Sequence, residues 1–156
     1  MKRLLPVALV LLAAGCGGGS STPTQTAVPA TRAAAPAEAA TPLPALQRVQ
    51  VGGKRVVFTF SRPVAHARGR FVQALHTDVS DTVVPVAGGA LLVMRFEPAT
   101  DRGYTGAAKV TAKGPVLEVV RGGDVAGLLT WAIGLDTERT FHVAHRGATV
   151  VVTFGL

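Results

Sequence analysis

Beyond residue 46, few side chains could bind a metal ion or act as a nucleophile. Their spacing in the sequence does not match that of a known metal or catalytic site. The segment "HVAH" separates His142 from His145 by three positions, which is the spacing of zinc ligands on a helix. The residues around it predict a strand, on which positions i and i+3 point to opposite faces. We therefore interpret both histidines as surface or turn residues and expect no metal. Ser61 and Ser80 lack the Gly-x-Ser-x-Gly setting of an acyl-enzyme nucleophile.

Two acidic pairs could act as general acid and base. "DVSD" places Asp78 and Asp81 in an expected loop, and Asp136 and Glu138 follow a long apolar run. Paired carboxylates hydrolyse glycosides, but acids in loops more commonly cap the backbone of turns. We expect no enzymatic activity and no cofactor. A hydrolase with an unrecognised site is a third hypothesis, behind the two binding functions given below.

The most distinctive charged feature is a stretch without acids. From position 48 to position 77 the chain has six basic residues and no Asp or Glu: Arg48, Lys54, Arg55, Arg62, Arg68 and Arg70. If the first strands are neighbours, these residues make part of the surface strongly positive, and such a field concentrates anionic partners. They are candidate polymer-binding residues. An ordinary solvated face is the alternative interpretation.

The beginning of the chain has the layout of a secretory signal. In "MKRLLPVALVLLAAG", residues 1–15, a positive start precedes an apolar run and then small residues. The run is shorter than the roughly 18–20 residues that cross a bilayer. A short anchor that is never cleaved is the alternative.

Cys16 is the only cysteine, so it has no disulfide partner within the chain. "LAAGCGGGSS" resembles the lipobox of bacterial lipoproteins, although Ala13 stands where that family prefers Leu. The resemblance implies cleavage before Cys16 and attachment of diacylglycerol to it. Two acyl chains anchor a protein stably. We expect an extracytoplasmic protein held on the outer face of the cell membrane, where nucleic acid is not an expected partner.

Composition divides the remainder into a tether and one domain. Residues 16–46 are rich in Ala, Pro, Thr, Ser and Gly and have no aromatic residue, so they cannot bury enough apolar surface to order themselves. We interpret them as a lipidated, disordered tether. Residues 47–156 hold 13 basic and 8 acidic residues, a net charge of +5, and suit one domain with one core.

Alternating apolar and polar residues predict strands throughout this domain. "VVFTFS" and "ATVVVTF" alternate most clearly, and glycine or proline turn signals separate the candidates. The expected strands are 48–51, 56–61, 70–75, 91–96, 109–112, 116–121, 128–135, 140–144 and 149–154. Short strands in this number indicate an all-β fold, a single sandwich or barrel, with no helix.

The stretch "GLLTWAIGLD" contains the only tryptophan. As a strand, Leu128–Leu135 places Leu129, Trp131, Ile133 and Leu135 on one face and smaller residues on the other. This pattern fits a central strand that packs on both faces, with Trp131 buried. A helix after Asp124 and an exposed, sugar-stacking Trp131 are the alternatives.

These residues also carry a resemblance to a family. "RVQV…KRVVFTF", "GGALLVMRFEPA" and "GPVLEVVRGGDVAGLLTWAIGLDTERTFHVAHRGATVVVTF" are similar to the AMIN-like domain of actinobacterial lipoproteins. Its most specific part is Gly123-Asp124 through Asp136, with Phe141 and Val143. The short "VGGKRVV" turn departs from the longer loop of many members.

The resemblance implies a β-sandwich and kinship with AMIN domains, which bind peptidoglycan or envelope partners. It supplies no catalytic residue. We expect a membrane-tethered module, AMIN-like over residues 47–156, that binds peptidoglycan or an associated anionic wall polymer. The alternative is a protein-binding adaptor that localises an envelope enzyme or secretion partner by pairing at a strand edge.

Overall fold

The computed structural model describes residues 41–77 and 82–155, all within one compact unit, Ala39–Leu156. The expectations for the signal, for Cys16 and for most of the tether lie outside the described residues. So do those for Asp78, Asp81 and Ser80. The described residues contain no helix that could cross a membrane.

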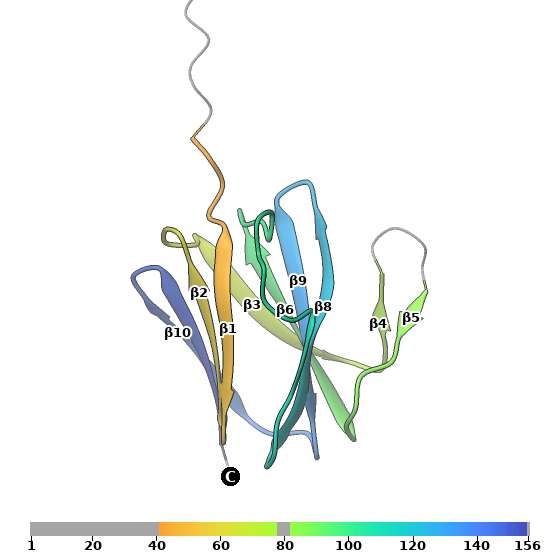
Figure 1. Ribbon diagram of the computed structural model, residues 1–156. Helices are drawn as coiled ribbons and strands as arrows, with labels where there is room; N and C mark the ends of the chain where they lie inside the picture. Colours follow the sequence, from red (N-terminus) through yellow and green to blue (C-terminus); the bar gives the residue numbers. More distant parts are fainter. Residues whose placement is uncertain (1–40, 78–81, 156) are drawn as a thin grey trace, which may run out of the picture. The chain divides into compact units, whose positions relative to one another are not determined.

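The described residues form eleven strands in three sheets. They are β1 (Leu46–Gly52), β2 (Arg55–Phe60), β3 (His66–Val72), β4 (Leu75–His76), β5 (Val83–Val84), β6 (Ala90–Glu97), β7 (Lys109–Thr111), β8 (Val116–Val125), β9 (Leu128–Leu135), β10 (Phe141–Arg146) and β11 (Thr149–Phe154). A four-stranded sheet has the order β1-β2-β11-β10 and a five-stranded sheet the order β3-β6-β9-β8-β7, with β4 and β5 as a small hairpin. Figure 1 shows the two large sheets face to face. The expected all-β, sandwich-like fold is confirmed.

Alternation along the strands builds the four-stranded sheet. On β2, Val56, Phe58 and Phe60 are buried while Val57 and Thr59 are half-exposed. β11 pairs with β2 and has the same pattern. Because side chains alternate between faces, one face of this sheet enters the core and the other faces outward.

Aromatic side chains pack in the core between the two large sheets. The rings of Phe58 and Phe96 lie 4.8 Å apart, and those of Phe58 and Trp131 lie 6.1 Å apart. Tyr104 packs edge-on against Trp131 at 5.7 Å. Trp131 is fully buried, so the prediction from its aliphatic neighbours is confirmed.

The strand β9 is the middle strand of the five-stranded sheet and is packed on both faces, as its pattern predicts. Its outward face meets a second, smaller apolar cluster, in which Val93 and Ala132 are buried together with Leu75 of the β4–β5 hairpin. A Cβ atom on Gly134 would overlap the carbonyl oxygen of Ala87, so only glycine admits that close approach.

Three parts of the fold differ from the sequence prediction by more than two residues. β8 continues through Gly122 and Gly123 to Val125, whereas the pattern predicted a strand that ends at residue 121 and a turn at these glycines. The third strand is His66–Val72, whereas the pattern predicted residues 70–75. The β4–β5 hairpin was not predicted, because its strands have two residues each and show no periodicity.

Candidate anion-binding site

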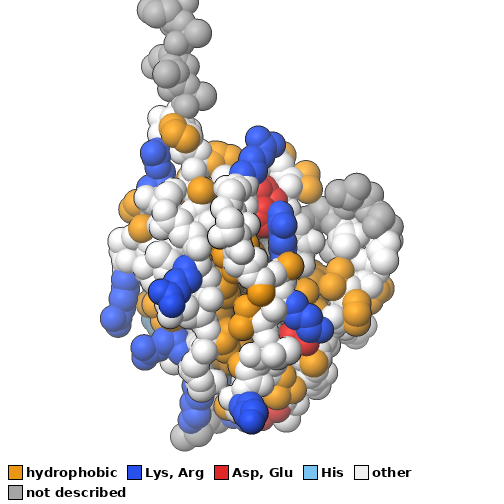
Figure 2. Space-filling view, viewed as in Figure 1, with side chains coloured by type: hydrophobic (Ala, Val, Ile, Leu, Met, Phe, Trp, Pro, Cys, Tyr) orange, Lys and Arg blue, Asp and Glu red, His pale blue; other side chains and the backbone are white. Residues whose placement is uncertain are grey.

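Acidic and basic side chains are distributed unequally over the two sheets. β1, β2, β10 and β11 contain no acid; every described acid belongs to the five-stranded sheet or its loops. In Figure 2 the visible acidic side chains lie on the side of β8 and β9. On the opposite side, over β2 and β10, Lys and Arg side chains are visible and no acidic side chain is. A positive field therefore surrounds the four-stranded sheet.

Most of these acids are engaged in the fold. Glu118 pairs with Lys109 at 2.8 Å, and Asp136 pairs with Arg139 at 2.8 Å in the loop after β9. The hydrogen bond from Arg139 holds the pKa of Asp136 below its ordinary value. The interpretation of residues 136–139 as a turn after the core strand is confirmed.

A partly buried network of acidic side chains ties the segment after β6 to β8. Asp124 accepts hydrogen bonds from the Thr100 hydroxyl at 2.5 Å and from the Asp101 amide at 3.0 Å. Asp101 accepts one from Arg121 Nη2 at 2.5 Å. Burial raises the pKa of Asp101, against the lowering effect of Arg121 and with a further rise from Asp124.

The motif residues that carry the family resemblance therefore have structural positions. Asp124 anchors the segment after β6, Gly127 turns the chain with a φ of 83°, and Trp131 fills the core. Gly134 admits the backbone at Ala87, and Asp136 holds the next loop. A ligand site must use other side chains.

The six candidate polymer-binding residues fall into two separate sets. Arg48 and Arg55 point outward from the four-stranded sheet, with Lys54 in the turn between β1 and β2 and Arg62 just after β2. Arg68 and Arg70 belong to β3, in the other sheet. The first strands are thus not all neighbours, and the six residues do not form one surface.

On β3, the arginines meet a third arginine that the sequence prediction missed. Arg68 lies directly opposite Arg95 of β6, and Arg70 lies opposite Val93. All three arginines are exposed. They line a hollow of about 290 Å³ together with Gly69, Val72 and Val93. We call Arg68, Arg70 and Arg95 the β3 arginine strip.

The β3 arginine strip has the features of an anion site. Like charges directly opposite each other on two strands destabilise a sheet, and no described acid forms an ion pair with any of the three. A guanidinium group binds carboxylates and phosphates through two parallel hydrogen bonds. An anion placed between Arg68 and Arg95 would relieve their repulsion.

The histidines of "HVAH" lie apart from this strip. His142 pairs in register with Thr153 and His145 with Val150, which places the two side chains on opposite faces of β10 as expected. Within residues 41–77 and 82–155, no three potential metal ligands come together.

These features define a small β-sandwich domain in which arginine is the commonest charged residue among the described residues. The AMIN-like domain model matches residues 44–153, so the chain belongs to the AMIN-like domain family. This family is associated with envelope-binding modules, which supports a binding role. Comparison with curated proteins and with solved structures gives no significant match.

Proposed function

We propose that the protein is an extracytoplasmic module, anchored to the membrane through Cys16, that binds an anionic polymer of the cell wall without catalysis. The observation that carries the proposal is the β3 arginine strip, in which Arg68 and Arg95 oppose each other without an acidic partner among the described residues. Family membership supports the location in the envelope.

The arrangement of the acids supports binding over chemistry. Asp101 is paired with Arg121, Glu118 with Lys109 and Asp136 with Arg139. A general acid or base needs a carboxyl group within hydrogen-bond reach of the substrate, and these three are committed to cations of the chain itself. Among the described acids, Glu97 and Glu138 form no ion pair, and they lie on different elements, β6 and the loop after β9.

The anchor is tested at its single attachment residue. Cys16→Ala should block both lipid attachment and signal cleavage, because the lipobox cysteine serves both steps. Metabolic labelling with an acyl-chain analogue measures the first step and the mass of the product measures the second. Label that persists in the variant would exclude Cys16 as the site.

The polymer is tested by co-sedimentation of the full-length chain, in detergent, with purified cell wall at about 0.1 M and about 1 M salt. The double variant Arg68→Glu with Arg70→Glu should weaken binding at low salt. High salt should weaken wild-type binding because the Debye length shrinks from about 10 Å to about 3 Å. Each exposed contact contributes only about 0–1 kcal/mol, so two substitutions are needed.

A matched control separates a local site from net charge. Arg48→Glu with Arg55→Glu changes the charge by the same amount on the outer face of the other sheet. We expect this variant to retain most of the binding. If both double variants lose binding equally, the whole positive field binds the wall. If neither loses it at any salt concentration, the strip is only a solvated face.

The adaptor hypothesis has a weaker structural basis. An incoming strand needs a free sheet edge, and β1, β3, β7 and β10 are the edge strands of the two large sheets. β1 has a bulge between Leu46 and Arg48, β7 has three residues, and β3 is charged, which leaves β10, with six residues in regular register, as the edge that an incoming strand could use. Bulges, short strands and charges oppose edge pairing. Binding that needs lysate proteins, and not purified wall, would favour the adaptor.

A further inference from the structure

Two hollows adjoin the β3 arginine strip where β3 leads into β4. One has a volume of about 560 Å³ and the other about 640 Å³. Both are lined by the connecting segment and by one residue of the loop after β9: Phe71, Val72, Gln73, Ala74 and Glu138. We call the two hollows the β3–β4 cleft. Their volumes lie within the range of about 300–1,000 Å³ that is usual for small-molecule sites.

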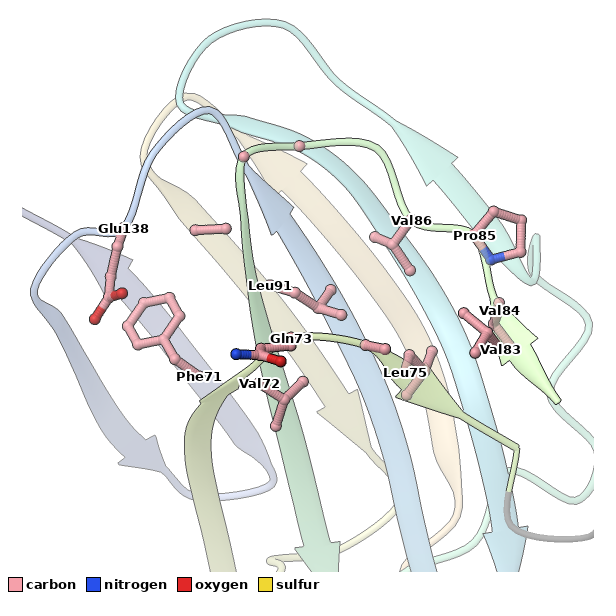
Figure 3. Close-up of a pocket in the computed structure, with 14 residues that line it drawn as sticks. Phe71, Val72, Gln73, Leu75, Val83, Val84, Pro85, Val86, Leu91 and Glu138 are labelled. Carbon is pink, nitrogen blue, oxygen red and sulfur yellow. The ribbon is translucent and has the colours of Figure 1, made fainter. Parts of the chain in front are cut away.

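One end of the β3–β4 cleft is apolar. Figure 3 shows Leu91 at its base, with Leu75 and the hairpin residues Val84 and Pro85 at the end away from Glu138. At the rim, Val83 is 55% exposed and is one of the few exposed large apolar side chains among the described residues. This end suits an apolar side chain of a ligand.

The other end of the cleft has opposite charges on its walls. Arg70 and Glu138 line the same hollow, yet no ion pair joins them, and neither pairs with another described residue. The neighbouring pair Asp136 and Arg139, by contrast, is closed at 2.8 Å. Arg70 and Phe71 are consecutive on the edge strand β3, so their side chains leave the strand on opposite faces. A ligand that lies along this free edge can reach the open cation with one group and the open anion with another.

The surroundings of Glu138 favour an ammonium group as its partner. Its carboxylate lies beside the ring of Phe71 (Figure 3). An ammonium ion is attracted both to a carboxylate and to the face of an aromatic ring. Glu138 would repel a polyanion. Binding of a polyanion to the β3 arginine strip therefore does not explain why this carboxylate lies at this end of the cleft.

We propose that the β3–β4 cleft binds a short peptide with a free ammonium and a free carboxylate. The carboxylate pairs with Arg70, the ammonium pairs with Glu138 beside Phe71, and an apolar side chain enters the region of Leu75 and Leu91. This site is separate from the polymer function proposed above, although Arg70 borders both surfaces. The two charges at one end of the cleft and the apolar region at the other define the ligand.

The test uses three forms of one probe with the full-length, ¹⁵N-labelled chain: Leu-Leu dipeptide, its N-acetyl form and its C-terminal amide. Chemical-shift titration should give shifts at residues 70–76 and 138 with the free dipeptide. Arg70 and Glu138 are both exposed, so losing one of these charge pairs weakens binding by up to about fivefold. Both blocked forms should therefore bind a few-fold more weakly, by up to about fivefold.

Two variants assign the charges. Glu138→Gln should weaken the free dipeptide to the affinity of the N-acetyl form and have little further effect on that form. Arg70→Gln should weaken binding of the free dipeptide to the affinity of the C-terminal amide and have little further effect on the amide. Glu97→Gln is the control, because Glu97 is an exposed acid at the end of β6 that does not line the cleft. It should bind all three probes as the wild type does.

Two outcomes would overturn the proposal: equal binding of all three probes, and no shift at residues 70–76 at millimolar dipeptide. The two proposals fail separately. Glu138→Gln should bind the dipeptide more weakly and keep its co-sedimentation with wall. Loss of wall binding in the arginine variants tests only the polymer proposal. Dipeptide binding without any wall binding would support the cleft proposal alone.

Discussion

Asp124 and Thr100, 24 residues apart in the chain, are joined by a hydrogen bond of 2.5 Å between carboxylate and hydroxyl. The same carboxylate oxygen accepts the Asp101 amide at 3.0 Å. One side chain on β8 therefore fixes the segment that follows β6, and this segment supplies Tyr104 to the core against Trp131. This contact explains the aspartate of the family motif.

Asp124→Ala should destabilise the domain by about 2–3 kcal/mol, because it removes two charge-assisted hydrogen bonds and leaves the Asp101 amide without its acceptor. Urea unfolding, followed by the fluorescence of Trp131, measures the change. Asp124→Asn keeps an acceptor oxygen and should lose less than half as much. Equal losses in the two variants would show that the charge, and not the hydrogen bonding, is what matters.

The pH dependence of stability should carry the signature of Asp101. Burial raises its pKa above the unfolded value of about 3.9. Between those two pKa values the folded chain holds a proton that the unfolded chain has released, so the free energy of unfolding falls as pH rises. Asp101→Asn should remove this fall in urea titrations across the acidic range.

Asp136 supplies a control of opposite sign. Its hydrogen bond from Arg139 lowers its pKa, so its contribution is present above the unfolded pKa and is lost as pH falls through the folded pKa. Asp136→Asn should therefore leave the fall that is due to Asp101 in place. A wild-type profile that rises throughout the window would contradict the raised pKa of Asp101.

Trp131 should report the state of the core without interference, since it is the only tryptophan. Its emission should be blue-shifted and poorly quenched by acrylamide in the folded chain, because its side chain is fully buried. Trp131→Ala should cost about 3–5 kcal/mol as a large-to-small core substitution, while Trp131→Phe should cost less. A freely quenched, red-shifted tryptophan would move this residue to the ligand-binding surface.

The strand β9 shows how far the sequence predicts this fold. Its bounds, Leu128–Leu135, were predicted to the residue, because a long apolar run with large side chains on one face is bounded by Gly127 and Asp136. β3 was misplaced by four residues at its start. Gly69 and two arginines interrupt its apolar pattern, since the strand lies at a sheet edge and buries none of its side chains fully.

The β3 arginine strip could be predicted only in part, because its residues come from strands that are distant in the sequence. The composition of the first strands indicated Arg68 and Arg70, but their third member, Arg95, lies 25 residues beyond Arg70 among apolar neighbours. It joins them through the register between β3 and β6. Register between distant strands depends on the packing of the whole sheet, so a local pattern does not contain it.

The turn between β8 and β9 should be improvable. Ala126 and Gly127 are its two central residues and have φ values of 51° and 83°. Two-residue hairpin turns with positive φ at both positions favour Asn-Gly, and a non-glycine residue in this region costs about 1–2 kcal/mol. Ala126→Asn should raise the free energy of unfolding by about 0.5–1 kcal/mol. Gly127→Ala, in the same thermal unfolding series, should lower it.

The last prediction concerns Arg68 and Arg95, whose functional and structural effects should have opposite signs. Arg95→Glu replaces a pair of like charges by a pair of opposite charges at directly opposed positions. Cross-strand pairs of this kind contribute about 0.2–1 kcal/mol, so the variant should be more stable than the wild type by about that amount. Its binding to purified wall should nevertheless fall, because one of the three guanidinium groups is lost.

Arg48→Glu is the matched control, since Arg48 lies opposite the uncharged Thr59 on the other sheet. It makes the same change in net charge, and its stability should stay within about 0.5 kcal/mol of the wild type. Urea unfolding and co-sedimentation with wall, measured on both variants, separate the two effects. If the β3 arginine strip binds the polymer, the Arg95→Glu variant should be more stable than the wild type and bind wall more weakly. The Arg48→Glu variant should be nearly unchanged in both respects. Unchanged binding with raised stability would mean that Arg68 and Arg95 repel each other without serving a ligand.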